Sequence, residues 1–285
     1  MNQTIYDGKR NGLYRSRVED FLIDRGVRNM SMTDAHYHPY YEFFYVTRGN
    51  CRMFVEHSLF SVSSGELVIL PPSTLHRTQY DTDSPVERIT LNFTPDYALD
   101  LEMFLGKGFL ENQLKVGKMR FIGKSSDEFF SLLEKFLEEN SRSDSFSTGM
   151  RKGLLAEILV LIARNTEQMQ DKESLIDEAE ANIQDAAKYI FEHYAEDITL
   201  EDASSVAKMR DTYFSKKFRD VTGFGFKEYL TNIRIQHSAE MLTSGNLTVT
   251  QVALSCGFSD ANYFGDIFKK KTGFSPRDFR RMKQN

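Results

Sequence analysis

Four of the six histidines lie between positions 36 and 76, and a glutamate at position 42 lies among them. His36, His38 and Glu42 share even parity, so an extended strand would point all three to one face of a sheet. His76 follows downstream and can complete the group. Imidazoles with one carboxylate are ligands that suit Zn, Fe, Ni or Mn. These four residues therefore form a candidate divalent-metal site.

The same region also fits a pocket for a small effector. Tyr40 and Phe44 have the parity of His38 and Glu42, so their rings could line the pocket and stack on the face of a sugar. The alternatives are structural histidines and aromatic residues that belong to an ordinary barrel core. The expected effector-binding residues are His36, His38, Tyr40, Glu42 and His76.

Short segments rich in aromatic and β-branched residues carry these side chains and end at Gly, Pro and Asn residues. They span residues 33–94. Several short strands with such turns predict a small antiparallel barrel or sandwich. The clearest strands are expected at 41–46, 52–56, 66–70 and 86–93.

The hydrophobic period changes to that of a helix at residue 127. Two amphipathic helices are predicted within 127–165, separated by the Ser-rich segment 141–147, and a short polar loop makes them an antiparallel pair. Their apolar seam could pack on the barrel, join a partner chain, or do both. The polar segment 164–180 is predicted to be a linker.

The C-terminal part contains an internal repeat. Residues 213–224 match residues 263–274, with Tyr, Phe, Phe, Thr, Gly and Phe at a constant offset of 50. Upstream, Thr199 and Thr248 each precede an Asp or Gln by three residues, which is close to a capping box. The pattern of each unit therefore predicts a capped helix, a turn and a second helix with one apolar face, which is a helix-turn-helix. Two copies are too few for a solenoid, which needs about three.

Polar side chains on the second helix of each unit could reach base edges and phosphates. One connecting helix is expected at 226–242. Its length of ~25 Å could hold the two reading helices near one DNA turn apart, ~34 Å. The expected DNA-binding residues from this pattern are Arg210, Thr212, Ser215, Lys216, Arg219, Asn262 and Lys269.

A long ordered signature runs through this block, including Gly257-Phe258-Ser259-Asp260, Tyr263-Phe264 and Thr272-Gly273-Phe274-Ser275-Pro276. With these motifs, the chain from Ile183 to Met282 resembles the DNA-binding domain of the AraC/XylS family of transcription regulators. The resemblance implies seven helices, with two recognition helices in adjacent major grooves. It adds Asp266 to the expected DNA-binding residues. It also implies double-stranded DNA, RNA polymerase, a small effector and a second copy of the chain as partners.

The sequence departs from the family pattern in three places. Arg210 stands where the family usually has a capping Ser, and Arg cannot accept the helix N–H bonds. Ser204 occupies a position of a small apolar residue, so a mild packing defect is expected there. Gly265 and Asp266 offer no bidentate donor to guanine, although Asp can accept from a cytosine amino group. The second motif should therefore contribute less to base recognition and depend on Asn262 and on phosphate contacts.

In the N-terminal half, His36-Tyr-His38 with Glu42 and Gly49, and then Gly65, Pro71 and His76, are similar to the two motifs of the cupin barrel. Cupin metal enzymes bind a divalent ion through three such His and one Glu. Ser73 stands where those enzymes have Gly. AraC/XylS regulators commonly have a cupin-like sensing barrel that binds a sugar or a similar effector without a known metal. The resemblance therefore implies a sensing domain that requires no cofactor, with a divalent metal as an open alternative.

We therefore expect an α+β protein of two domains, with a cupin-like β-barrel and helix pair before an all-α double helix-turn-helix domain. The expected boundaries are 1–124 for the barrel, 125–168 for the dimerisation helix pair, 169–181 for the linker and 182–285 for the DNA-binding domain.

The composition excludes several protein classes. The 285 residues are 40% hydrophobic and 27% charged, with no apolar run near the ~20 residues that span a bilayer. Cys51 and Cys256 stand alone, so neither a disulfide framework nor a CxxC metal site is present, and a cytoplasmic compartment fits best. Residues 182–285 hold 15 basic and 13 acidic side chains, a net of +2, and the preceding 181 residues hold 21 and 28, a net of −7.

The leading interpretation is a ligand-responsive transcription activator that acts as a dimer and is not an enzyme. The alternatives are a metal-dependent cupin enzyme or metal sensor fused to a DNA-binding module, and a regulator whose barrel is only a dimerisation platform. No Ser-His-Asp order, phosphate loop or paired-carboxylate motif supports another enzyme class, and no catalytic residue is assigned.

Overall fold

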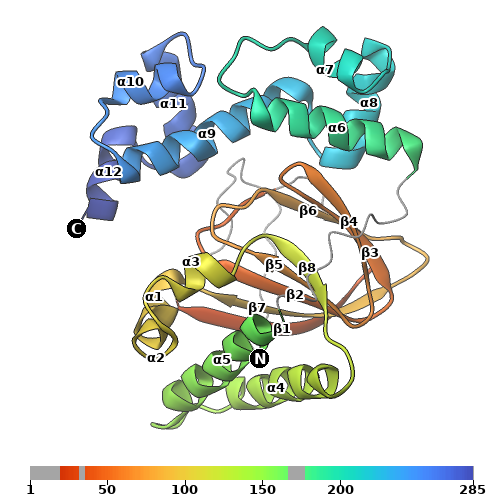
Figure 1. The fold of residues 1–285 in the computed structure, drawn as a ribbon, viewed down its shortest axis with the longest axis vertical. Helices are drawn as coiled ribbons and strands as arrows, with labels where there is room; N and C mark the ends of the chain where they lie inside the picture. Colours follow the sequence, from red (N-terminus) through yellow and green to blue (C-terminus); the bar gives the residue numbers. More distant parts are fainter. Residues whose placement is uncertain (1–19, 32–35, 166–176, 285) are drawn as a thin grey trace.

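The computed structural model describes residues 20–31, 36–165 and 177–284. Its elements stack in four layers (Figure 1): a helix pair, a five-stranded sheet, a three-stranded sheet and a C-terminal domain of helices. The α+β architecture with an N-terminal β domain and a C-terminal helical domain is therefore confirmed.

Two antiparallel sheets form the N-terminal domain, with strand orders β1-β7-β2-β5-β8 and β4-β3-β6. Alternation along β2 sends Phe43 and Tyr45 to the core shared with the helix pair, whereas Phe44 and Val46 pack between the sheets. The strands are β1 (Phe21–Arg28), β2 (Tyr41–Arg48), β3 (Asn50–Val55), β4 (Ser58–Ser63), β5 (Glu66–Leu70), β6 (His76–Gln79), β7 (Val86–Phe93) and β8 (Gly117–Arg120).

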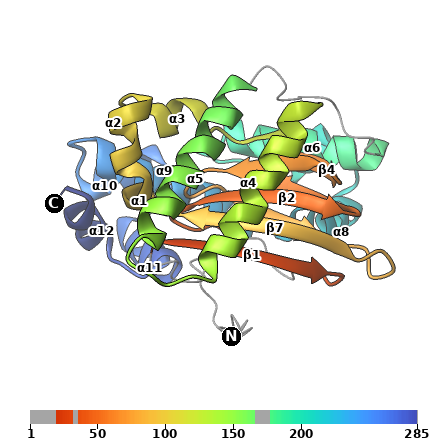
Figure 2. The same cartoon turned by 90° about the horizontal axis from the view of Figure 1, so that it is seen from below.

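The predicted helix pair covers the outer face of the larger sheet (Figure 2). Phe129 and Phe136 of one helix and Ile158 of the other are fully buried against that sheet, so the pair packs on its own barrel. The helices of this domain are α1 (Pro95–Ala98), η1 (Leu99–Leu101), α2 (Glu102–Leu105), α3 (Phe109–Gln113), α4 (Lys124–Asn140) and α5 (Ser147–Arg164).

The C-terminal domain contains two helix-turn-helix units, α7–α8 and α10–α11, joined by the long helix α9 (Figure 1). Each unit begins at a complete capping box, on Thr199 and on Thr248. The helices are α6 (Glu178–Glu192), α7 (Leu200–Val206), α8 (Asp211–Thr222), α9 (Phe226–Ser244), α10 (Val249–Ser255), α11 (Ala261–Thr272) and α12 (Pro276–Gln284).

The expected strands at 41–46, 52–56, 66–70 and 86–93 all overlap observed strands. The outer strands β1 and β8 lie outside the range in which strands were expected. Most of the expected linker at 169–181 falls outside the described residues, and α6 begins at Glu178. Among the described residues, no helix combines the length and the apolar character that a membrane crossing would require.

The capping box at Thr199 gives a test of how the first unit is held. Asp202 N–H donates to the Thr199 hydroxyl over 3.2 Å, and Thr199 N–H donates to the Asp202 carboxylate over 2.8 Å. We expect Thr199→Ala to lower the free energy of unfolding by about 1 kcal/mol, because helix N–H groups lose their acceptor. Urea unfolding measures the loss, with Thr199→Ser as the control that keeps the hydroxyl. Equal stability of the Ala and Ser variants would contradict this role.

Candidate functional site

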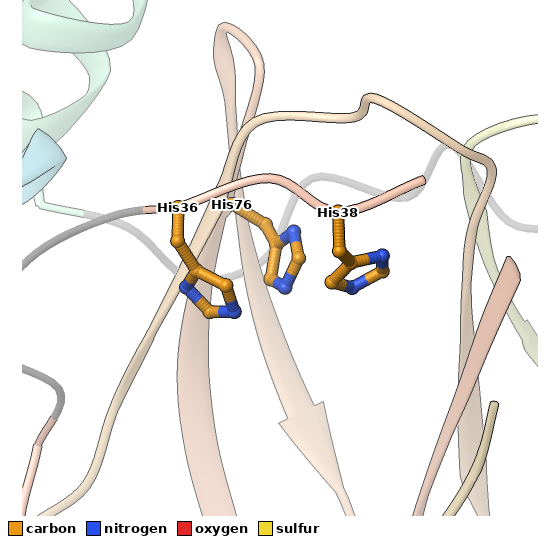
Figure 3. A group of neighbouring side chains, drawn as sticks. All are labelled: His36, His38 and His76. Atoms are coloured by element: carbon orange, nitrogen blue, oxygen red, sulfur yellow. The ribbon is translucent and has the colours of Figure 1, made fainter. Parts of the chain in front are cut away.

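Three histidines meet on two adjacent backbone segments (Figure 3). His36 and His76 pair as an isolated antiparallel bridge, with both N–H···O distances at 2.9 Å. Their ring centroids lie 4.3 Å apart, and that of His38 lies 4.9 Å from His76. One ligand atom from each ring falls within 4.8 Å of the others, and metal binding stays a prediction.

Backbone carbonyls orient two of these rings. His38 Nδ1 donates to the Tyr40 carbonyl and His76 Nδ1 donates to the Thr74 carbonyl, each over 2.9 Å. Since a carbonyl only accepts, each Nδ1 carries a proton and each Nε2 is directed towards Glu42. His38 Nε2 donates to that carboxylate from the doubly protonated ring, so it would have to lose this proton to bind a metal. The carboxylate of Glu42 lies 3.0 Å from His38 Nε2 and 4.0 Å from His76 Nε2. All four residues of the candidate metal site are thus brought together.

Burial and neighbouring charges set the protonation of Glu42 and His76 in this cluster. Burial raises the pKa of Glu42, but the hydrogen bond from His38 and the nearby imidazoles outweigh it and lower that pKa to about 2. Burial and the charge of His38 lower the pKa of His76 to about 4, against the opposing effects of Glu42 and the Thr74 carbonyl. At neutral pH, Glu42 is therefore ionised and His76 is neutral.

The donor set fits a small divalent cation. Zn–N distances of about 2.0–2.1 Å place tetrahedral ligand nitrogens about 3.4 Å apart, so the three nitrogens, which lie within 4.8 Å of one another, would draw closer on binding one ion. Metal-bound histidines usually donate their other ring N–H to a carbonyl, as His38 and His76 do here. Tyr40 stacks on His38 at 3.9 Å, so one face of its ring is covered by that imidazole.

Tight turns hold the histidine segments. Ser73 N–H donates to the His38 carbonyl over 2.7 Å, and Ser73 has a left-handed φ of 68°. This conformation suits Gly better than residues with a Cβ, so Ser73 adopts it at some cost in energy.

The turn between β2 and β3 needs a glycine. Gly49 has φ 87°, and a Cβ there would lie 3.0 Å from the Pro85 carbonyl. Glycine is therefore required at that turn.

Strand β7 adds polar residues that the sequence analysis missed. Arg88, Thr90 and Asn92 lie opposite Val46, Phe44 and Glu42 in the β2–β7 register, so they share the inner face of the sheet.

The Arg88 guanidinium lies over the Phe44 ring and donates to the Thr90 hydroxyl over 2.8 Å. Asn92 is 7% exposed, and its Oδ1 has no hydrogen-bond partner among the described residues. The alternation of polar and apolar residues over 88–93 was the signal that could have revealed this wall.

The predicted DNA-binding residues lie on the side of α8 and α11 that faces away from the hydrophobic core, or at the start of these helices. Each helix buries two phenylalanines at its core face, Phe214 and Phe218 on α8, and Phe264 and Phe268 on α11. The residues that lie exposed on the two helices or at their N-caps are Arg210, Thr212, Lys216, Arg219, Asn262, Asp266 and Lys269, while Ser215 is half-buried.

The N-terminal ends of the two reading helices differ. Arg210 is the N-cap of α8 and makes no side-chain cap bond, so its guanidinium remains exposed at the reading surface. Asp260 caps α11 and accepts from Asn262 N–H over 2.6 Å and from Tyr263 N–H over 3.0 Å. The α11 N-terminus thus places a carboxylate beside Asn262.

Two further exposed residues belong to this surface. Tyr213 and Tyr263, the equivalent tyrosines of the repeat, are 53% and 55% exposed, and their phenols can donate to phosphate. The repeat itself was the signal, because it keeps a tyrosine at the same position of both reading helices.

The expectation of a packing defect at Ser204 was wrong. Its hydroxyl is buried and contacts both the Glu201 carbonyl, at 3.1 Å, and the Asp211 carboxylate, at 2.6 Å. Ser204 therefore ties α7 to the first residue of the reading helix.

Comparisons with known proteins match the N-terminal and C-terminal parts of the chain to two different family models. Residues 21–159 match the family model of the AraC-like ligand binding domain, and residues 203–282 match that of a helix-turn-helix domain. The uncharacterized HTH-type transcriptional regulator YijO of Escherichia coli is 38% identical over 94 residues, 33% of this chain and 33% of its own length. YisR of Bacillus subtilis, another uncharacterized HTH-type transcriptional regulator, is 24% identical over 255 residues, 85% of this chain and 86% of its own.

The chain thus spans about a third of the length of YijO, and also of several matching Staphylococcus aureus regulators. Among solved structures, an apo form of ToxT from Vibrio cholerae aligns over 94% of this chain and 99% of its own, with 14% identity and a TM-score of 0.41.

The shifted pKa values predict acid sensitivity. Unfolded His76 titrates near 6.5 and folded His76 near 4, so below pH 6.5 the unfolded state binds more protons and the native state loses stability. We expect a loss of about 2 kcal/mol between pH 7 and pH 5. Glu42 adds a further loss as the pH falls from 4.5 towards 2, because its folded pKa is depressed.

Urea unfolding at pH 7, 6 and 5, followed by circular dichroism, measures the stability. His76→Gln removes the titrating group, so its stability should change less over this range. The same pH dependence in both proteins would show that His76 is not the cause.

Proposed function

The chain belongs to the AraC/XylS family of transcription regulators, and on that premise we propose that it is a ligand-responsive activator that senses a small polar effector in its barrel and binds DNA through α8 and α11. The observation that carries the proposal is the duplicated helix-turn-helix, with exposed polar faces over buried phenylalanines. The relatives are named transcriptional regulators, and the proposal assigns no catalytic residue. The proposed DNA target would have it act in the cytoplasm.

The two units would contact successive major grooves. Helix α9 has 19 residues, about 28 Å at 1.5 Å per residue, and joins units whose grooves are ~34 Å apart. Arg210, Thr212, Ser215 and Lys216 would read bases in the first groove, with Arg219 on phosphate. In the second groove, Asn262 would read a base and Lys269 would contact phosphate.

The carboxylate of Asp266 disfavours phosphate on its side of α11, so base recognition would depend mainly on the first unit.

The effector would be small and polar. Glu42 accepts, the Arg88 guanidinium donates, and the Asn92 amide offers a buried oxygen that needs a donor. Such a set matches the hydroxyl groups of a sugar or a similar hydroxylated molecule. His36, His38, Tyr40 and His76 would form the end of the same pocket.

We also propose that two copies act together and that the DNA-bound dimer contacts RNA polymerase. Phe146 and Met150 at the start of α5 are exposed large apolar side chains. They lie on the helix pair that the sequence analysis assigned to dimerisation, so a second copy could bury them.

A second candidate is a metal-responsive regulator, which the carbonyl-oriented imidazoles favour. His36, His38 and His76 would hold a divalent cation, with Glu42 supplying the negative charge. A bound cation would join the two histidine segments through coordination bonds. Its role would be to fix their arrangement rather than to catalyse a reaction.

The first reading helix gives a direct test of DNA binding. Arg210→Ala combined with Lys216→Ala should weaken operator binding by about 10- to 100-fold, because base and phosphate contacts are lost. Gel-shift titration measures the affinity, with Lys188→Ala as the control because Lys188 lies on α6, near His57 of the barrel. Unchanged affinity in the double variant would remove α8 from the DNA interface.

Isothermal titration of the full chain with Zn²⁺ tests the second candidate. We expect one ion per chain, and His38→Ala should lower the affinity at least about tenfold, because a ligand is lost. His193→Ala is the matched control, since His193 is half-buried at the end of α6 and bonds Glu196, away from the three histidines. Absence of binding by the wild type would exclude a metal sensor.

A further inference from the structure

The histidines of the pocket alternate with residues that contact the DNA-binding domain. Tyr37 lies between His36 and His38, and Leu75 and Arg77 flank His76. Side chains in extended backbone alternate between faces, so histidines on the pocket side imply neighbours on the opposite side. That opposite side is covered by α6, α8 and α9 (Figure 1).

Two of these neighbours belong to the hydrophobic core that contains the first helix-turn-helix unit. Tyr37 and Leu75 are buried in one hydrophobic core with Phe214 and Phe218 of α8. The second unit has a separate core, which among the described residues includes none from either sheet. The barrel therefore holds one reading helix directly and the other only through α9.

Polar contacts reach the end of the same reading helix. Arg77 Nη1 and Gln79 Nε2 both donate to the Asp220 carbonyl, over 2.9 and 2.6 Å. This carbonyl lies in the last turn of α8, where carbonyls lack partners within the helix. Strand β6 thus carries a pocket histidine at its first residue and two donors to α8 further along.

The β3–β4 hairpin makes a second connection. Glu56 N–H donates to the Leu75 carbonyl over 2.7 Å, and the Glu56 carbonyl accepts from the Tyr229 hydroxyl of α9. The backbone beside His76 is therefore linked to α9 through two successive hydrogen bonds.

We propose that Tyr37, Leu75, Arg77 and Gln79 form a clamp that couples the pocket to the first reading helix, and that the clamped state binds DNA more weakly. The inference rests on the proposed function and names its regulation. A ligand that moves the histidine segments moves the clamp residues with them, because both belong to the same short backbone stretches. By linkage, DNA binding must then perturb the pocket as well.

Charge sets the direction of the effect. The clamp keeps the N-terminal domain beside α8, and two exposed carboxylates, Asp81 and Asp83, lie just beyond Gln79, which bonds that helix. The reading residues stay exposed while clamped, so the main effect on DNA is electrostatic repulsion of a polyanion. Release of the clamp removes this repulsion from the first unit.

The first experiment measures DNA affinity in the full chain, using a duplex selected by the wild type from a random pool. Arg77→Ala with Gln79→Ala should bind about fivefold more tightly than the wild type. Arg48→Ala is the matched control, because Arg48 is exposed at the end of β2 and has no part in the clamp. Equal or weaker binding by the double variant overturns the proposal.

Amide hydrogen exchange tests the coupling itself. Adding the duplex to the wild type should speed exchange at residues 73–79 about fivefold, and His38→Gln without DNA should speed exchange in 211–222 but not in 261–272. Wild-type exchange in either case overturns the coupling. If selection yields no duplex that the wild type binds, the proposed function fails. Hydrogen exchange then still tests the clamp, because the Arg77/Gln79 double variant should exchange faster than the wild type at 73–79 and 211–222.

Discussion

The alternation of side chains along the strands is the constraint on which both functional parts depend. In β2 and β7 it turns Glu42, Arg88 and Asn92 inward while their neighbours join the core under the helix pair. In the histidine segments it turns the imidazoles inward and Tyr37 and Leu75 towards the helical domain. A shift of one residue in register would exchange these faces, losing the pocket and the domain contact together.

The two reading helices obey a different constraint, which is the need to keep a polar face exposed over a small apolar core. Pairs of phenylalanines four residues apart fill that core in both units, and capping boxes fix where each unit begins. The units are nonetheless unequal. Arg210 leaves its helix uncapped and a cation exposed, whereas Asp260 closes its helix with a bonded carboxylate.

The duplicated motif and the strand parity could be predicted because both depend on neighbours in the sequence. Parity grouped His36, His38 and Glu42, although bends at Pro39 and Tyr40 separate the two histidines from β2, so that no single strand carries all three. The repeat located both reading helices. The sequence did not reveal β1 and β8, whose pairing partners are distant in the chain, nor the polar face of β7. Docking of Arg77 on Asp220 joins residues 143 positions apart, which no local pattern encodes. The hydroxyl of Ser204 has a near partner instead, because the turn between α7 and α8 brings Asp211, seven positions later, close to it.

Helix α9 acts as a lever whose base touches the barrel at Tyr229 and whose far end carries the second unit. Over about 28 Å, a tilt of about ten degrees displaces the tip by about 5 Å, more than the 3.4 Å between stacked base pairs. A small rearrangement at the base would therefore change which base step the distant helix meets. The distance between the two DNA segments that the protein can bind would then depend on hydrogen bonds that make no contact with DNA.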